Sequence, residues 1–531
     1  MAENGTVHAP IKSSWMRPLL IFFKDARLAF KIDSLTKEIL VIGIPAAIAV
    51  AADPLASLID TAFIGHLGPV QLAATGASIA LFNQALRITV FPLVSITTSF
   101  VAEEDTKEKI NALAAEKKLA EIIKADELEK GVTKENNNET PKESLAVNGE
   151  IKVLVDGTSK NVTNKGNAGK KKRRLASAST ALLFGLLLGL FQAAILILLE
   201  KPLLYAMGLK HNSPMLVPAG KYLRLRALGS PAVLLSMVMQ GIFRGFKDAT
   251  TPLYVILSGY ALNVALDPIL IFYCKLGIEG AAISHVLAQY VMALALLLIL
   301  MKKMVLLPPG LKDLQIFRFL KNGGLVLARV VAVTFCITLS ASLASRLGPI
   351  KMAGFQVCLQ VWLTSSLLAD GLAVAVQAIL ACSFTEKNNE KVAAAAARTL
   401  QLGFILGVIL FIFVGAGLYF GAGMFSNSIL VVQFIKIGMP YVAATQPINS
   451  FAFVFDGIYY GSSDFAYSAY SLILASIVSI GSLFLLYESN GFVGIWIGLT
   501  INMSLRMLAG VWRMGTGTGP WRFLRSHPMS V

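Results

Sequence analysis

The chain has 531 residues, of which 55% are hydrophobic and only 15% are charged, and its mean hydropathy is +0.67. This composition excludes an ordinary soluble globular protein and predicts an all-α polytopic membrane protein, because apolar stretches of about 20 residues span a bilayer. The formal net charge of +16 is explained most simply by basic cytoplasmic loops beside acidic lipids. The sequence contains no basic–aromatic module of the kind that binds nucleic acid, so a nucleic-acid partner is not expected.

The first 39 residues alternate between polar, basic and amphipathic stretches, and we expect no cleavable secretory signal among them. After them, hydropathy predicts twelve transmembrane helices, at residues 40–63, 77–101, 177–199, 220–243, 252–273, 279–301, 322–345, 354–381, 397–420, 431–455, 465–487 and 491–513. With twelve spans, most clusters of Lys and Arg fall on one side, so both termini should be cytoplasmic. The segment between the third and fourth spans departs from this rule and carries Lys201, Lys210, Lys221, Arg224 and Arg226.

The first predicted span carries two acids, Asp53 and Asp60, within an otherwise apolar run. They are seven residues apart and therefore lie near one face of a helix, which Pro54 should bend. A carboxyl at membrane depth is costly and normally faces a cavity or a partner. Asp60 is thus a candidate proton-responsive group, and the alternative is a buried structural acid with a hydrogen-bond partner.

A long hydrophilic insertion, residues 102–175, follows the second span, and its stretch 103–174 contains 16 Lys/Arg and 14 Asp/Glu. Opposite charges at helical spacing predict a charged helix from Lys107 to Lys130, and the polar composition of the rest predicts disorder. The basic run Lys170 to Arg174 should anchor the chain to the membrane surface, with a targeting signal as the alternative.

The fifth predicted span carries Asn263 and Asp267 four residues apart, on one helix face. Together with Asp60 they could form a protonation centre in the first half of the chain. The alternative is that Asp267 caps a neighbouring loop. We expect His285, in the sixth span, to be a satisfied core histidine rather than a proton relay.

Arg87, Arg329 and Arg506 lie well inside the second, seventh and twelfth predicted spans, where we expect them to be buried cations. The guanidinium fork suits carboxylates, so these residues are candidates for binding an anionic substrate. The alternative for each is a snorkelling side chain or an ion pair with a resident acid, for which Asp370 and Asp456 are available.

The second half of the chain repeats the first. Leu67–Ala73 matches Leu347–Ala353, although Ser340 stands where the first half has Asp60. Further matches join the glycine-containing segments that begin at Gly229, Gly245 and Gly277 to those that begin at Gly438, Gly461 and Gly491. Six spans per half make the repeats parallel, and such repeats usually place a substrate site between two lobes. The predicted organisation is an N-terminal segment (1–39), an N-lobe (40–302), a linker (303–321), a C-lobe (322–513) and a tail (514–531).

Three segments resemble the multidrug and toxic compound extrusion (MATE) family in its DinF-like branch. They are Asp60-Thr-Ala-Phe-Ile-Gly-His-Leu-Gly-Pro, Arg244-Gly-Phe-Lys-Asp-Ala-Thr-Thr-Pro252 and Asn263-xxx-Asp267-Pro268, and the resemblance covers about residues 35–515. The long loop, with Ser99-Phe-Val-Ala-Glu-Glu-Asp-Thr106 at its start, resembles that of plant citrate-efflux carriers linked to iron translocation and aluminium tolerance.

This resemblance implies two six-helix lobes in a V and proton binding at Asp60, Asn263 and Asp267. One departure is Ala56, where the family often has a tyrosine four residues before the first acid. With the candidate arginines, the resemblance favours a proton-linked secondary transporter that exports citrate through the plasma membrane. Substrate binding is assigned to Gln84, Arg87, Arg329 and Arg506.

The alternative within this class is a proton-coupled exporter of organic cations or neutral metabolites. An enzyme is not expected, because the histidines and cysteines form no ligand cluster or nucleophile–base pair in the sequence. No cofactor or metal is expected either. A receptor or scaffold that does not transport remains the alternative from a different class.

Overall fold

The computed structural model describes residues 33–132, 175–207, 209, 211–305, 315–425 and 429–526, and nearly all of them are helical. In this part of the chain, nine helices are long and apolar enough to span a membrane, and two further spans are helix pairs bent by 45° and 48°. One of the nine, α16 (Phe465–Gly515), contains two spans, because Gly491 has a φ of +54° that interrupts the helix. The predicted number of twelve spans is therefore confirmed.

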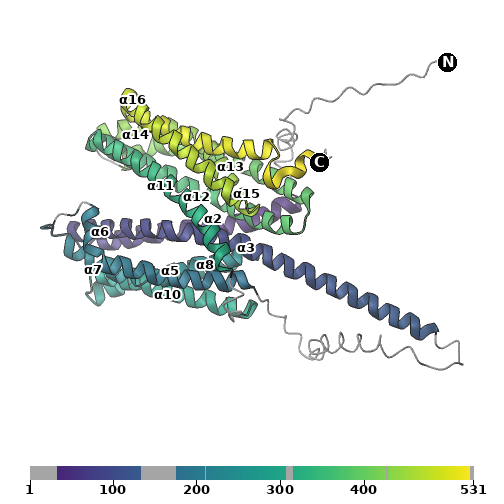
Figure 1. Ribbon diagram of the computed structural model, residues 1–531. Coiled ribbons are helices and arrows are strands. Elements are labelled where there is room, and N and C mark those ends of the chain that lie inside the picture. The colour runs from purple at the N-terminus through teal and green to yellow at the C-terminus, as the bar shows by residue number, and fades with distance from the viewer. Residues whose placement is uncertain are drawn as a thin grey trace, which may run out of the picture.

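The helices form two separate bundles (Figure 1). The N-lobe consists of α2 (Ser34–Gly65), α3 (Pro69–Val132), α5 (Ala176–Leu198), α6 (Glu200–Ala206), α7 (Leu216–Ala227), α8 (Ser230–Gly245), α9 (Thr250–Pro268), the π-helix η2 (Ile269–Tyr273) and α10 (Ile278–Lys303). The C-lobe consists of α11 (Ile316–Arg346), α12 (Pro349–Thr385), α13 (Asn389–Phe425), α14 (Ile429–Ala444), α15 (Gln446–Gly461) and α16, followed by η3 (Gly519–Arg522) and α17 (Phe523–Ser526).

The two lobes are in contact at one end, from which α3 projects, and they separate towards the α6 end (Figure 1). At the contact, α2 crosses α12 so closely that a Cβ on Gly371 would lie 2.6 Å from the Cβ of Ala47. Ile39 and Ile42 of α2 share a buried cluster with Ile379 of α12. We call this the closed end.

Hydrogen bonds and ring contacts join α3 to the C-lobe at the closed end. Gln377 donates through Nε2 to the Ser95 carbonyl at 2.6 Å and to the Ser99 hydroxyl at 2.8 Å. The rings of Phe100 and Phe319 pack edge to face, with centroids 5.2 Å apart. The lobes are thus held together by specific contacts as well as by apolar packing.

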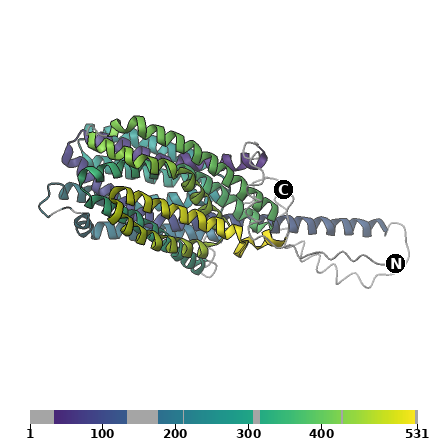
Figure 2. The ribbon, with the colours of Figure 1, turned by 90° about the horizontal axis from the view of Figure 1, so that it is seen from above.

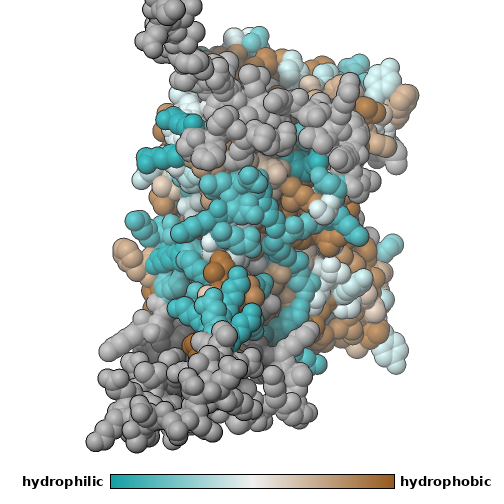
Figure 3. Space-filling view, turned by 90° about the vertical axis from the view of Figure 1, so that its right-hand side faces the viewer, coloured by the Kyte–Doolittle hydropathy of each residue, from teal (hydrophilic) through white to brown (hydrophobic). Residues whose placement is uncertain are grey.

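Ion pairs surround the closed end, where hydrophilic residues gather (Figure 3). Glu38 pairs with Lys247 of the N-lobe at 2.7 Å and with Lys391 of the C-lobe at 3.8 Å. Asp33 accepts a bond from the Thr36 N–H at the start of α2 and pairs with Arg398 of α13 at 2.7 Å. Burial raises the pKa of Asp33, but the hydrogen bonds from Thr36 and the charge of Arg398 outweigh it and lower the pKa to about 2.

Helix α3 continues to Val132, so the charged segment from Lys107 to Lys130 is helical in the structure. This extension projects beyond both lobes (Figure 2). At its base, Glu103 pairs with Arg318 of α11 at 2.5 Å, and Glu104 accepts the first backbone N–H groups of α5. The segment predicted to be disordered, with the basic run Lys170 to Arg174, lies outside the described residues, as does the N-terminal segment before Asp33.

Candidate functional site

The acids of the N-lobe meet at the contact between α2 and α9. Asn263 donates through Nδ2 to Oδ1 of Asp60 at 3.2 Å, and both side chains are buried. One turn further along α9, Asp267 accepts a hydrogen bond from the Ser284 hydroxyl of α10. The three residues that the sequence grouped therefore lie together, with Asp267 immediately before the proline at which α9 passes into the π-helix η2.

His285 is a fourth member of this cluster. Its Nδ1 lies 2.9 Å from Oδ2 of Asp60, and its ring is fully buried. Sequence reasoning favoured an ordinary core histidine and did not pair it with Asp60, which is 225 residues away in the chain. One sequence feature could have indicated the contact between His285 and Asp60. His285 follows Ser284 directly, and two adjacent polar residues within an apolar span suggest that this part of the span faces other polar groups.

Several polar atoms of the cluster are buried without a hydrogen-bond partner in the described part of the chain. They are Oδ1 of Asn263, Oδ2 of Asp267 and Nε2 of His285. Buried polar groups are normally satisfied, so these atoms leave places for protons or water. A carboxyl bonded to an amide and an imidazole, next to a second carboxyl bonded to a hydroxyl, can hold a variable number of protons, which is the chemistry expected of a proton-responsive element.

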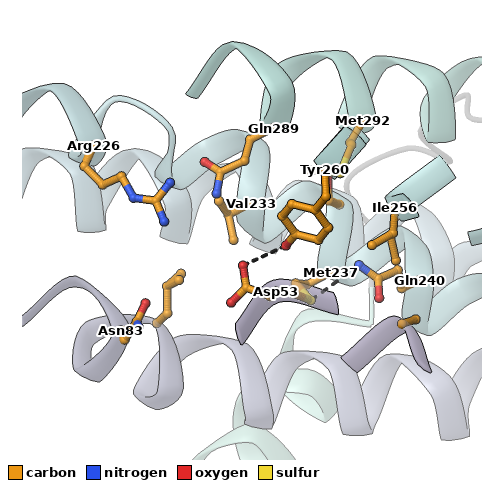
Figure 4. A pocket seen from close by; sticks show the side chains of 13 residues that line it. Asp53, Asn83, Arg226, Val233, Met237, Gln240, Ile256, Tyr260, Gln289 and Met292 are labelled. Carbon is orange, nitrogen blue, oxygen red and sulfur yellow. Dashed lines mark hydrogen bonds between the residues drawn. The ribbon is translucent and has the colours of Figure 1, made fainter. Parts of the chain in front are cut away.

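A small cavity lies beside the cluster, between α2, α3, α7, α8, α9 and α10 (Figure 4). Within it the Tyr260 hydroxyl donates to Oδ1 of Asp53 at 2.7 Å. Its polar lining also includes Asn83, Arg226, Gln240 and Gln289. The sequence placed Arg226 just inside the fourth span and singled it out only as an exception to the loop-charge rule. The structure puts it in α7, the first half of a broken span, within electrostatic range of Asp60 and Asp267.

The arginines of the C-lobe are occupied by a resident acid. Arg329 is paired with Asp456 of α15 and bonded to the hydroxyls of Tyr460 and Ser468. Arg506 pairs with the same carboxylate at 2.7 Å. For these two residues the structure shows the ion-pair alternative, with Asp456 rather than Asp370 as the acid.

Arg87 differs from the other two arginines. It is exposed, and among the described residues no acid lies within salt-bridge distance of it. Gln84 precedes it by one turn on the same face of α3. From Gln84, helical spacing continues to Ser95 and Ser99, which contact the C-lobe. Gln84 therefore lies on the side of α3 that turns towards the second lobe, and the exposed side chain of Arg87 lies at the edge of that side.

Comparison with known proteins gives three similarities. The MatE family model matches residues 156–269 and 326–485. Protein DETOXIFICATION 43 of Arabidopsis thaliana is 56% identical, over 100% of this chain and 99% of its own. The chain belongs to the MatE family. Protein DETOXIFICATION 42 of the same plant is a second MATE relative, 55% identical over 96% of this chain and 97% of its own.

A solved structure, described as the outward-facing conformation of a multidrug resistance MATE family transporter, matches with a TM-score of 0.71. It is 18% identical and the match covers 95% of this chain and 99% of the other, so it supports the MATE fold alone. MATE proteins are efflux transporters coupled to protons or sodium. The chain is therefore a multi-pass membrane transporter of this class.

Proposed function

We propose that this MATE protein exports citrate from the cytosol through the plasma membrane and that protons control its cycle. In a plant, such efflux supports iron translocation or aluminium tolerance. The resemblance of the long loop's sequence to that of citrate-efflux carriers favours this substrate, and membership of the MatE family supports export as the direction of transport.

One observation carries the substrate assignment: Arg87 is exposed at the edge of the face of α3 that turns towards the C-lobe, and no acid among the described residues pairs with it. A guanidinium without a resident counter-ion attracts a carboxylate, and its fork can bind one through two parallel hydrogen bonds. In this proposal Gln84 assists Arg87, while Arg329 and Arg506 bind substrate only after Asp456 releases them.

We assign the closed end to the cytoplasm, where its Lys and Arg residues would face acidic lipids. The described chain begins at the closed end, where Asp33 pairs with Arg398, and the yellow C-terminal part of the ribbon ends on the same side (Figure 1). With this orientation the lobes are open to the outside, and both termini are cytoplasmic.

The membrane potential is sufficient to drive citrate export. A trivalent anion that leaves a cell at about −100 mV releases about 7 kcal/mol, at about 2.3 kcal/mol per charge. Efflux therefore requires no proton gradient, so protonation of Asp60 and Asp267 would set the conformational cycle rather than supply the energy.

The test is efflux of preloaded radiolabelled citrate from oocytes that express the chain or its Arg87→Gln variant. We expect the variant to reduce citrate efflux about tenfold or more, the effect of losing about 1.4 kcal/mol of anion stabilisation. Arg346→Gln, at the exposed end of α11, is the matched control for loss of charge. Normal citrate efflux by Arg87→Gln at equal surface abundance would refute the role of Arg87.

The acids of the N-lobe favour a second candidate, a proton-coupled exporter of organic cations. Asp53, Asp60 and Asp267 lie near a single arginine, Arg226, in that lobe. A labelled organic cation is therefore run beside citrate. Cation efflux without citrate efflux would retain the transporter class and overturn the proposed substrate.

A further inference from the structure

Arg226 is a buried arginine of the N-lobe that pairs directly with no acid among the described residues, although Asp60 and Asp267 lie within electrostatic range. Its side chain is 5% exposed, and Nε and Nη1 are buried with no hydrogen-bond partner in the described part of the chain. The guanidinium carbon lies 5.1 Å from the ring centre of Phe82, which holds the group in place. A buried guanidinium that lacks hydrogen bonds is costly, so this site is incomplete without an occupant.

The guanidinium of Arg226 points into the cavity beside the acid cluster, with Asp53 and Tyr260 further along (Figure 4). The amides of Asn83 and Gln240 also line this cavity. Gln289 lines it as well, with its Oε1 buried against Gly229 and its amide nitrogen on the cavity side. The lining thus offers one cationic group and amide donors.

The cavity volume of about 40 Å³ is room for a few waters or one small polar group, because one water needs about 10–15 Å³. It does not enclose a tricarboxylate. An anion held by Arg226 must therefore insert one arm and leave the rest outside the cavity.

We propose that this N-lobe cavity binds one carboxylate arm of the transported anion on Arg226, with the amides that line the cavity as further donors. The site rests on and deepens the proposed function, because citrate carries carboxylate arms. It adds a second anion contact to the one at Arg87, within the lobe that also holds the acid cluster.

The surrounding ionisable groups give this site a defined pH dependence. They are Asp53 and Asp60 on α2, Tyr222 on α7, Tyr260 and Asp267 on α9, and His285 on α10. The ionised carboxylates repel an incoming anion, and this repulsion disappears when they are protonated. Protonation of His285 adds a positive charge that attracts the anion. Anion and protons therefore bind cooperatively, and by reciprocity the bound anion promotes protonation.

The experiment measures citrate binding to the purified full-length protein in lipid nanodiscs by calorimetry. Arg226→Gln should weaken binding about 10- to 100-fold, as expected for loss of a charge-assisted pair. Arg226→Lys should restore part of it. Arg224→Gln is the matched control, because Arg224 lies two residues away in α7 and pairs with Glu200 at the surface.

A second variant covers the case in which Arg226→Gln does not fold. Asn83→Asp adds a carboxylate to the cavity while Arg226 remains, and we expect it to weaken citrate binding and to steepen the loss of affinity as pH rises. Folding of every variant is checked by size-exclusion chromatography and melting temperature.

The outcomes separate this proposal from the proposed function. Unchanged citrate affinity in a folded Arg226→Gln protein overturns the site even if citrate efflux is normal. Phosphate bound as tightly as citrate overturns the assignment to a carboxylate arm. If citrate is not exported but malate binds through Arg226, the site is supported and the proposed substrate is not.

Discussion

Asp60 is hydrogen-bonded to two helices, since Asn263, which donates to it, belongs to α9 and His285 belongs to α10. Both of its carboxylate oxygens therefore have a hydrogen-bond partner, as expected if Asp60 is a buried structural acid. Asp267 differs, because one of its oxygens is bonded to Ser284 and the other has no partner among the described residues. The cluster thus brings together two carboxyls, one bonded through both oxygens and one through a single oxygen.

Replacement of Asp60 by asparagine tests this view of the cluster. Asp60→Asn keeps the shape of the side chain but removes its titration, so we expect citrate efflux to lose most of its pH dependence. Loss of the charge-assisted bond to His285 should also cost about 1.5–3 kcal/mol of stability. The measurements are efflux across a pH series and the melting temperature of the purified variant.

Glu279→Gln is the control for the Asp60 experiment, because this carboxyl lies at the start of α10 and pairs with Lys221 at the surface. It should leave the pH profile of efflux unchanged. An Asp60→Asn protein that is folded, reaches the membrane and keeps the wild-type pH profile would exclude Asp60 as the proton-responsive group.

At the scale of elements, α2 connects the two lobes. Its first part, with Ile39 and Ile42, packs in one buried cluster with helices of the C-lobe. Its middle, with Ala49 and Ala52, packs against α9 within the N-lobe. The helix continues through Pro54 to Asp60, so one element connects the acid cluster to the closed end.

The glycine crossing between α2 and α12 can be tested directly. A Cβ at position 371 would lie 2.6 Å from both the Ala47 Cβ and the Gly43 carbonyl oxygen. Gly371→Ala should therefore overpack the closed end, at a cost of about 1–3 kcal/mol. We expect a lower melting temperature and faster maleimide labelling of a cysteine introduced at Ser99.

Gly417→Ala in α13 is the matched control for this prediction, because a Cβ added at Gly417 would meet no described atom within 4 Å. It should not alter labelling at residue 99. Equal labelling rates in the two variants would show that the crossing does not hold the closed end together.

The whole molecule is a pair of lobes joined at one end, so transport requires the closed end to open. Ser99 of α3 and Gln377 of α12 meet there through a hydrogen bond of 2.8 Å. The double variant Ser99→Cys with Gln377→Cys, treated with a short thiol crosslinker that contains a reducible disulfide, should be locked in this conformation. We expect efflux to fall to background and to recover after reduction.

Each single-cysteine variant and the crosslinker-treated wild type serve as controls for this lock, because the chain has four free cysteines, of which Cys274 is exposed. Efflux that persists in a fully crosslinked double variant would mean that the cycle does not open the closed end.

Much of the architecture was predictable from local patterns. Twelve spans follow from the lengths of apolar runs, and the charged helix beyond the second span follows from charges at helical spacing. The grouping of Asn263 with Asp267 depends on four-residue spacing within one helix, and the structure places Asp60 beside them. Such features are visible because helical neighbours are set by separation along the chain.

Only the tertiary structure decided which side chains meet across helices. In the structure His285 lies beside Asp60, and Arg329 and Arg506 both form ion pairs with Asp456. Arg226 faces a cavity and forms no direct ion pair with any described acid. The tertiary structure also closed the lobes at one end. The sequence alone determined the helices and their order, because these depend on local composition. Contacts between distant helices depend on how each helix is rotated and where it crosses its neighbours, which no short stretch of sequence specifies.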